Sequence, residues 1–181
     1  LSIVKSMTLH GLEGFIVDVQ VDVAGGLPCW EIVGLPDVSI REAKERVRTA
    51  IKNSGYEFPS RRIVINLAPA TIKKVGSAFD LPIAIAILFA TENINEFDLE
   101  NVAFVGELSL DGNVHSITGI LPMCIEAKKL GIKEIVVPKE NAKEASIVDG
   151  INVIPVSSLN QVVAYLNKSI KINPEKFNSN E

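Results

Sequence analysis

The sequence predicts a mixed α/β domain, in which helices pack on a mixed (α+β) sheet, and three observations support this fold class. Residues 15–23 alternate apolar and polar side chains, which is typical of a half-buried strand. Residues 81–90 are apolar all round, as expected of a helix buried in the centre of a domain. After residue 100, short strands alternate with helical segments, and this order implies parallel βαβ crossovers.

The first half of the chain should supply most of the sheet. Strands are expected over residues 3–10, 15–23, 30–33 and 63–67. The first two are separated by a short turn between Gly11 and Gly14, so they should form a hairpin. A helix is expected from Asp37, whose side chain can cap it, to about Ser54, and Gly55 should end it.

The second half of the chain contains shorter elements. Strands are expected over residues 102–109, 113–117, 134–137 and 153–156, and helices over residues 118–130, 139–147 and 157–167. Asp111 and Gly112 separate the first two of these strands and are a strong two-residue hairpin signal. Thr118 and Ser157 stand at the starts of two of the helices, where a hydroxyl can cap the free N–H groups.

Composition excludes several classes of protein. Cys29 and Cys124 are isolated and lack metal-ligand spacing, which favours a reduced, cytoplasmic setting. His10 and His115 are the only histidines, so a structural zinc site is not expected. The longest apolar run is too short to span a bilayer, and no leader-like segment opens the chain, so no membrane partner is expected.

The charge is distributed unevenly along the chain. The net charge is −4, but residues 41–74 contain nine basic and three acidic residues, whereas the remainder contains nine basic and nineteen acidic ones. All the arginines lie in this segment: Arg41, Arg46, Arg48, Arg61 and Arg62. Such concentration indicates an anionic partner more strongly than the overall charge does.

The helix expected over residues 38–54 carries a basic stripe beside its apolar face. The stripe consists of Arg41, Lys44, Arg48 and Lys52. The apolar face consists of Ile40, Ala43, Val47, Ala50 and Ile51. Like charges four residues apart destabilise a helix by about 0.2–0.5 kcal/mol per pair, although Glu45 can relieve this cost by pairing with Arg41 or Arg48. The stripe is therefore either a solvated face or a surface for nucleic acid or for an acidic neighbouring domain.

If nucleic acid is the partner, contacts should go mainly to phosphate, because no base-reading motif is present. The residues predicted to bind it are Arg41, Lys44, Arg48, Lys52, Arg61, Arg62, Lys73 and Lys74. They include the whole basic stripe and the basic residues that follow it. Charge reversal of Arg48 and Lys52 should then weaken DNA binding and reduce its salt dependence.

Ser77 lies in a loop between the strand over residues 63–67 and the buried helix. The free N–H groups of a helix N-terminus favour developing negative charge, so this is a suitable place for a nucleophile. The plain alternative, which we favour, is a loop or capping hydroxyl. Asp80 is likewise better interpreted as a helix N-cap than as an acid catalyst.

Several runs of residues together resemble one protein family. They are GLPDVSIREAKERVRTAIKNSGYEFPSRRIVINLAPA (34–70), GSAFDLPIAIAIL (76–88), VGELSLDGNV (105–114) and VVPKEN (136–141). Over residues 2–167 the chain resembles the N-terminal domain of the magnesium-chelatase-like AAA+ family typified by ComM and YifB. The resemblance implies a fold like that of the proteolytic domain of Lon and the C-terminal domain of RadA. These domains belong to the superfamily named for the second domain of a small-subunit ribosomal protein.

The resemblance to Lon also bears on Ser77, which falls where Lon has its nucleophilic serine. The lysine that activates this serine in Lon corresponds to Leu121, and a leucine cannot accept a proton. Nothing in the sequence orients or desolvates Lys73 or Lys74, as a lysine base would require. The resemblance therefore implies that Ser77 is a vestige of a nucleophile and that no residue here is catalytic.

The ATPase machinery of the family is not found in these residues, because no G-x-x-x-x-G-K-[ST] motif occurs in them. ATP and Mg²⁺ are therefore expected in a separate AAA+ module, and no cofactor is expected in residues 1–167. Residues 168–181 are polar and are interpreted as a linker or tail that leads toward that module.

The resemblance finally implies a role for the domain. ComM-like members are hexameric helicases that promote branch migration during the integration of transforming DNA. We expect a non-catalytic domain that guides DNA, or that packs against its own AAA+ module and neighbouring subunits in a homo-hexamer. Two alternatives remain: a serine peptidase that uses Ser77 with an unconventional base, and a purely structural oligomerisation domain.

Overall fold

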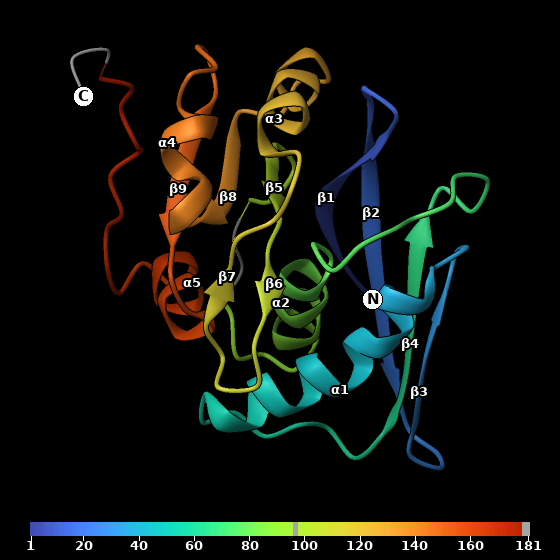
Figure 1. The fold of residues 1–181 in the computed structure, drawn as a ribbon. Helices are drawn as coiled ribbons and strands as arrows, with labels where there is room; N and C mark the ends of the chain where they lie inside the picture. The colour runs from blue at the N-terminus through green and yellow to red at the C-terminus, as the bar shows by residue number, and fades with distance from the viewer. Residues whose placement is uncertain (96–97, 179–181) are drawn as a thin grey trace.

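The first two strands form an antiparallel hairpin at the centre of the main sheet (Figure 1). β1 (Ser2–His10) and β2 (Glu13–Ala24) are joined by a tight turn, in which Gly11 adopts a positive φ of 65°. This computed structural model of the protein describes residues 1–95 and 98–178. The predicted hairpin is confirmed.

The main sheet has seven strands in the order β3-β4-β2-β1-β5-β8-β9. The strands added to the hairpin are β3 (Cys29–Val33), β4 (Arg62–Ala68), β5 (Val102–Phe104), β8 (Glu134–Pro138) and β9 (Asn152–Val156). β2 pairs antiparallel with β1 and β4, whereas the pairs β3–β4, β1–β5, β5–β8 and β8–β9 are parallel. The mixed sheet and the parallel crossovers predicted after residue 100 are confirmed.

Helices cover both faces of this sheet (Figure 1). On one face, α1 (Val38–Asn53), α2 (Asp80–Ala90) and α5 (Leu159–Leu166) share an aliphatic core with the strands. On the other face, α3 (Ile120–Lys129) and α4 (Ala142–Ala145) enclose a smaller core. α2 is buried over residues 80–88, as its apolar sequence predicts.

A second, two-stranded sheet joins the helices of the larger core. β6 (Glu107–Leu108) and β7 (Val114–His115) pair antiparallel around the predicted turn, in which Gly112 has a φ of +89°. The strand predicted over residues 102–109 is divided, because the chain leaves the main sheet after β5 and the Leu81 N–H donates to the Gly106 carbonyl at 3.0 Å. The hairpin therefore connects the start of α2 to the rest of the domain.

The helix caps agree only in part with the sequence prediction. Asp37 caps α1 by accepting a hydrogen bond from the Ile40 N–H at 2.9 Å, as predicted. Three other predicted caps are wrong. α3 begins after Gly119 and not at Thr118, α5 is capped by Ser158 and not by Ser157, and Asp80 is the first residue of α2 and does not cap it.

The helix predicted over residues 139–147 is shorter in the structure. Residues 139–147 contain a 3₁₀ turn, η1 (Lys139–Asn141), followed by the short α4. The polar segment after α5 returns to the domain, since the Glu175 N–H donates to the Val153 carbonyl at 2.8 Å. Residues 179–181 of the predicted tail lie outside the described residues.

Candidate functional site

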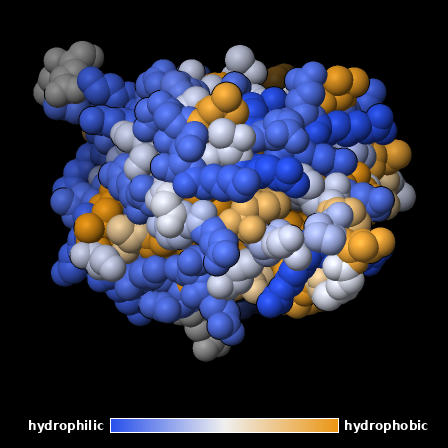
Figure 2. Space-filling view, turned by 90° about the horizontal axis from the view of Figure 1, so that it is seen from below, coloured by the Kyte–Doolittle hydropathy of each residue, from blue (hydrophilic) through white to orange (hydrophobic). Residues whose placement is uncertain are grey.

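α1 has the two faces that its sequence predicts. All five residues of its apolar face are fully buried against the sheet and α2. Of the basic stripe, Arg41 and Lys52 are exposed, and Lys44 and Arg48 are half-buried. Figure 2 views the end of the molecule at which α1 crosses in Figure 1, and hydrophilic side chains cover much of this face. The helix therefore presents a cationic surface to solvent.

The charge of this stripe is not neutralised within the described residues. The described ion pairs join Arg46 to Glu42, Arg46 to Asp80 and Lys129 to Glu126, and no residue of the stripe is among them. Glu45 forms no ion pair with Arg41 or Arg48 in the described residues, although the sequence allows one that would reduce the repulsion within the stripe. A helix that keeps four uncompensated cations on one side has a surface suited to an anionic partner.

The C-terminal end of the stripe meets two aromatic rings. The Arg48 guanidinium carbon lies 5.1 Å from the centroid of the Phe58 ring, which is a cation–π distance. Trp30 contacts Phe58 edge to face, with centroids 5.5 Å apart. The aromatic pair holds Arg48 in place, and no local sequence pattern predicts this contact because Phe58 follows the end of α1.

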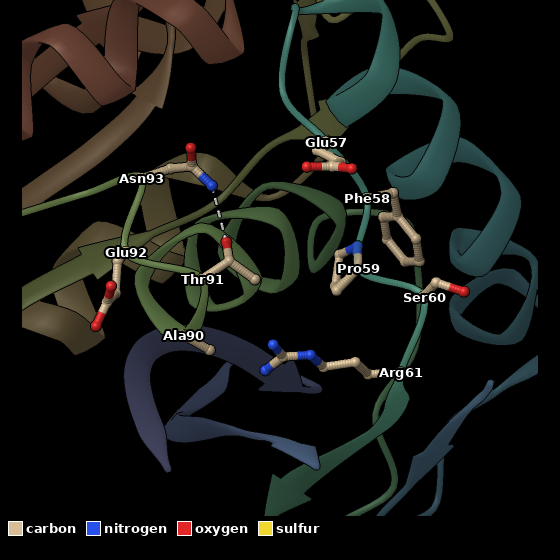
Figure 3. A pocket seen from close by; sticks show the side chains of 9 residues that line it. All are labelled: Glu57, Phe58, Pro59, Ser60, Arg61, Ala90, Thr91, Glu92 and Asn93. Atoms are coloured by element: carbon tan, nitrogen blue, oxygen red, sulfur yellow. Dashed lines mark hydrogen bonds between the residues drawn. The ribbon is translucent and has the colours of Figure 1, made fainter. Parts of the chain in front are cut away.

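Two hollows lie on either side of the segment 58–61. The smaller, of about 280 Å³, contains Arg48 and Lys52 in its wall. The larger is an open groove of about 710 Å³ between this segment and the end of α2. Figure 3 shows the Arg61 side chain extending across this groove toward Ala90. Glu57 and Glu92 also line the groove, so its charge is mixed.

The remaining predicted DNA-binding residues separate in space. Arg62 begins β4, and its side chain is on the face opposite to Ile63, which is buried under the helices, because side chains alternate along a strand. Arg62 therefore lies across the sheet from the α1 stripe. Lys73 is exposed in the loop before α2.

Lys74 is not at the surface, which corrects its place in the predicted basic set. Its side chain is fully buried, and its ammonium donates to the carbonyls of Gly34 (2.8 Å) and Pro69. Loss of hydration lowers the pKa of Lys74. Gly34 has a φ of +103°, and a Cβ there would lie 2.2 Å from the Leu67 carbonyl oxygen, so a glycine is needed for this loop to lie so close to β4. Lys74 thus ties two loops together and is unavailable to a phosphate.

Arg46 has a structural role that the sequence did not reveal. It forms a bidentate ion pair with Asp80, with nitrogen–oxygen distances of 2.7 and 3.0 Å. Asp80, whose side chain is fully buried, also accepts from the Leu108 N–H at 3.1 Å. This carboxylate therefore connects α1, α2 and β6. Burial raises the pKa of Asp80 to about 6, and the hydrogen bonds from Arg46 and Leu108 limit the rise.

The raised pKa of Asp80 predicts a specific pH dependence of stability. Between about pH 4 and pH 6 the folded chain holds a proton that the unfolded chain has released, so the contribution of Asp80 to the unfolding free energy falls as pH rises through this range and is constant above it. Urea unfolding of the wild type and of Asp80→Asn should show this slope only in the wild type. A stability difference that increases from pH 4 to pH 6 would contradict it.

Ser77 lies in a hollow of its own, three residues before α2 begins. Its hydroxyl donates to Glu107 Oε2 at 2.6 Å. The hollow, of about 330 Å³, is otherwise lined mainly by apolar and hydroxyl side chains from β1, the loop 75–79 and the segment 116–119. Glu107 comes from β6, and its place in the motif VGELSLDGNV does not identify it as the partner of Ser77.

No lysine, arginine or histidine lines the Ser77 hollow in the part of the chain that the structure describes. Leu121, at the position that corresponds to the lysine of Lon, is in the first turn of α3 and outside this lining. Lys74 is desolvated and oriented, contrary to the expectation from sequence, but toward the carbonyls of Gly34 and Pro69. Glu107 is therefore the one titratable partner that the described residues bring to Ser77.

Two further features are absent from residues 1–95 and 98–178. These residues contain no group of three His, Cys, Asp or Glu side chains that could hold a metal ion. None of their helices combines the length and the apolar character needed to cross a membrane.

The chain is similar to one protein family and to individual bacterial proteins. Residues 19–141 match the family described as subunit ChlI of Mg-chelatase. The chain is 38% identical over 172 residues to the competence protein ComM of Haemophilus influenzae, which covers 95% of this chain and 34% of ComM. It is 41% identical over 166 residues to the uncharacterized protein YifB of Escherichia coli, covering 92% and 33% of the two chains.

A more distant similarity concerns the fold. The chain is 28% identical over 191 aligned positions to Lon protease 2 of Bacillus subtilis, covering 95% of this chain and 33% of that protein. This agrees with the predicted Lon-like fold. The chain spans about a third of the length of the relatives that it matches.

Proposed function

We propose that this chain, which belongs to the family of subunit ChlI of Mg-chelatase, is a non-catalytic domain that guides DNA in a ComM-like AAA+ ATPase. In such an assembly, ATP and Mg²⁺ act in the ATPase module, and the ring of subunits moves on DNA during recombination in natural transformation. The setting would be the cytoplasm, and the assembly a homo-hexamer.

The observation that carries the proposal is the uncompensated basic stripe of α1. Its four cations lie on one side of a rigid helix, and no described carboxylate forms an ion pair with them. Phosphate contacts of this kind bind nucleic acid without reading its sequence. Arg61 is exposed and shares the smaller hollow with Arg48 and Lys52, and Lys73 is exposed in the loop before α2. Lys74 is buried, and Arg62 lies on the opposite face of the sheet.

The proposal is tested by a titration of fluorescently labelled single-stranded and duplex DNA with the chain. Saturable binding that weakens with salt is expected. The rival interpretation is a structural oligomerisation domain, whose stripe meets an acidic neighbour. In that case the size of the oligomer should fall with salt, and the chain should not bind either DNA.

The hydrogen bond between Ser77 and Glu107 favours a second candidate, a serine peptidase with a carboxylate as its base. We regard it as the weaker candidate because a carboxylate is a poorer base than a neutral lysine or histidine. The described lining of this hollow offers neither of those residues.

A fluorophosphonate probe distinguishes these two candidates. Because the base beside Ser77 is weak, we expect the wild type to be labelled no faster than Ser77→Ala, measured by intact mass. Denatured chain is the control for reaction at other sites. Labelling of Ser77 that depends on the folded state and disappears in Glu107→Gln would establish the peptidase and overturn the non-catalytic role.

A further inference from the structure

Arg48 carries a buried hydrogen-bond donor that the described residues do not satisfy. Its Nε atom is inaccessible to solvent and has no hydrogen-bond partner among them. A buried donor left without an acceptor costs about 1–3 kcal/mol. Phe58 holds the guanidinium in this position through the cation–π contact, so the side chain cannot easily relieve the deficit by turning to solvent.

The smaller hollow, of about 280 Å³, has Arg48 in its wall. It is lined by Pro28, Cys29, Trp30, Arg48, Lys52, Phe58, Pro59, Ser60 and Arg61. Arg48 and Lys52 are one helical turn apart on α1, and no carboxylate is in the described lining. Arg61 belongs to the wall shared with the larger groove, into which its side chain extends in Figure 3. The hollow is thus cationic, and neither Arg48 nor Lys52 forms an ion pair within the described residues.

We propose that this Arg48–Lys52 hollow binds a phosphate group. Phosphate oxygens would accept from the two terminal nitrogens of Arg48, which are not buried as Nε is, and the charge would be neutralised by the Arg48 guanidinium and the Lys52 ammonium. Arginine suits this role because its planar fork can give parallel hydrogen bonds to a phosphate, and lysine adds a flexible point charge. Phe58 and Trp30 keep the fork in place before the ligand arrives.

The phosphate can come from either of two sources: the backbone of a nucleic acid or a free phosphate. The first source rests on the proposed function, because it makes the hollow one of the contacts by which α1 holds DNA. The second source does not depend on it. An experiment with both ligands therefore tests the phosphate site separately from the proposed function in DNA binding.

Trp30 provides the readout, because it is the only tryptophan of the chain and lines the hollow. Iodide, an anion, quenches tryptophan fluorescence and should enter a cationic hollow, whereas neutral acrylamide reports general access. At constant ionic strength, inorganic phosphate and a short oligothymidylate should each reduce quenching by iodide several-fold while leaving quenching by acrylamide nearly unchanged.

Two variants and one matched control locate the effect. Arg48→Gln and Lys52→Glu should lose the protection by phosphate, and Lys52→Glu serves as the safer variant for folding because Lys52 is exposed. Arg62→Glu should keep the protection, since Arg62 is also an exposed cation but lies on the opposite face of the sheet. Protection that survives in both hollow variants would overturn the assignment.

The remaining outcomes are also decisive. Protection by phosphate without binding of the oligothymidylate supports the phosphate site and counts against the proposed function. Binding of the oligothymidylate by anisotropy, without protection of Trp30 by either ligand, overturns the phosphate site and leaves the proposed function standing. Protection by the oligothymidylate alone, lost in both hollow variants, supports the site with the nucleic-acid backbone as its source.

Discussion

The double variant Arg48→Glu/Lys52→Glu is expected to bind single-stranded DNA roughly a hundredfold more weakly than the wild type at low salt. Each residue contributes a charged contact to phosphate, and a loss of about 1.4 kcal/mol corresponds to a tenfold change in affinity. The reversed charges also repel neighbouring phosphates. Anisotropy of a labelled oligonucleotide measures the change.

The control for this prediction is Lys133→Glu/Lys139→Glu. Lys133 and Lys139 are exposed residues at the two ends of β8, on the part of the sheet away from α1, and the variant changes the net charge by the same amount. If binding depended only on net charge, the two double variants would be equally weak. We expect the β8 variant to remain within a few-fold of the wild type, and equal weakening would contradict a role for the α1 surface.

Arg46→Met is expected to destabilise the folded chain by about 3–5 kcal/mol at pH 7. The substitution leaves the Asp80 carboxylate buried without its cation, and an uncompensated buried charge is among the costliest changes in a protein interior. The loss should be smaller near pH 5, because protonation of Asp80 removes the charge. Urea unfolding followed by circular dichroism measures both values.

A second substitution tests whether charge, and not packing, explains this loss. In Arg46→Met/Asp80→Asn the buried carboxylate is replaced by a neutral group of similar shape, so part of the stability lost in Arg46→Met should return. A double variant that is less stable than either single variant, by the sum of their losses, would show that the two residues act independently.

Local patterns account for most of what the sequence predicted about the fold. The alternation in β2 and the uniform apolar character of α2 each reflect the burial of a single element, so they could be recognised without knowledge of the fold. The turn at Asp111 and Gly112 is local in the same sense. Cap positions were less secure, because Ser157 and Ser158 offer the same hydroxyl one residue apart and only Ser158 accepts the hydrogen bond.

The candidate site depends more on contacts between distant residues. Arg46 and Asp80 are 34 positions apart, and Ser77 and Glu107 are 30 positions apart. Nothing in either local sequence indicates the partner. From its local sequence Asp80 is predicted to be a helix cap, whereas in the structure it joins α1, α2 and β6.

For Lys74, the local sequence likewise does not show whether the charged side chain is exposed or buried. In the sequence it is one more cation in a basic segment, and its burial depends on the approach of Gly34 from a separate loop. The stripe of α1, in contrast, could be predicted because helical spacing alone places its four residues on one side. Its value for function rests on the absence of ion pairs to it in the described residues, which only the structure reveals.

The salt dependence of binding tests the central claim, that α1 holds DNA through phosphate contacts, most directly. For single strands the slope of log K against log salt is about −0.7 for each phosphate neutralised, so Arg48→Glu/Lys52→Glu should make the slope less steep by ~1.4. Titrations of one labelled oligonucleotide at several salt concentrations, with the wild type and this variant, supply both slopes. A shallower slope in the variant is the predicted result. Equal slopes, or a wild type that does not bind at low salt, would contradict the account.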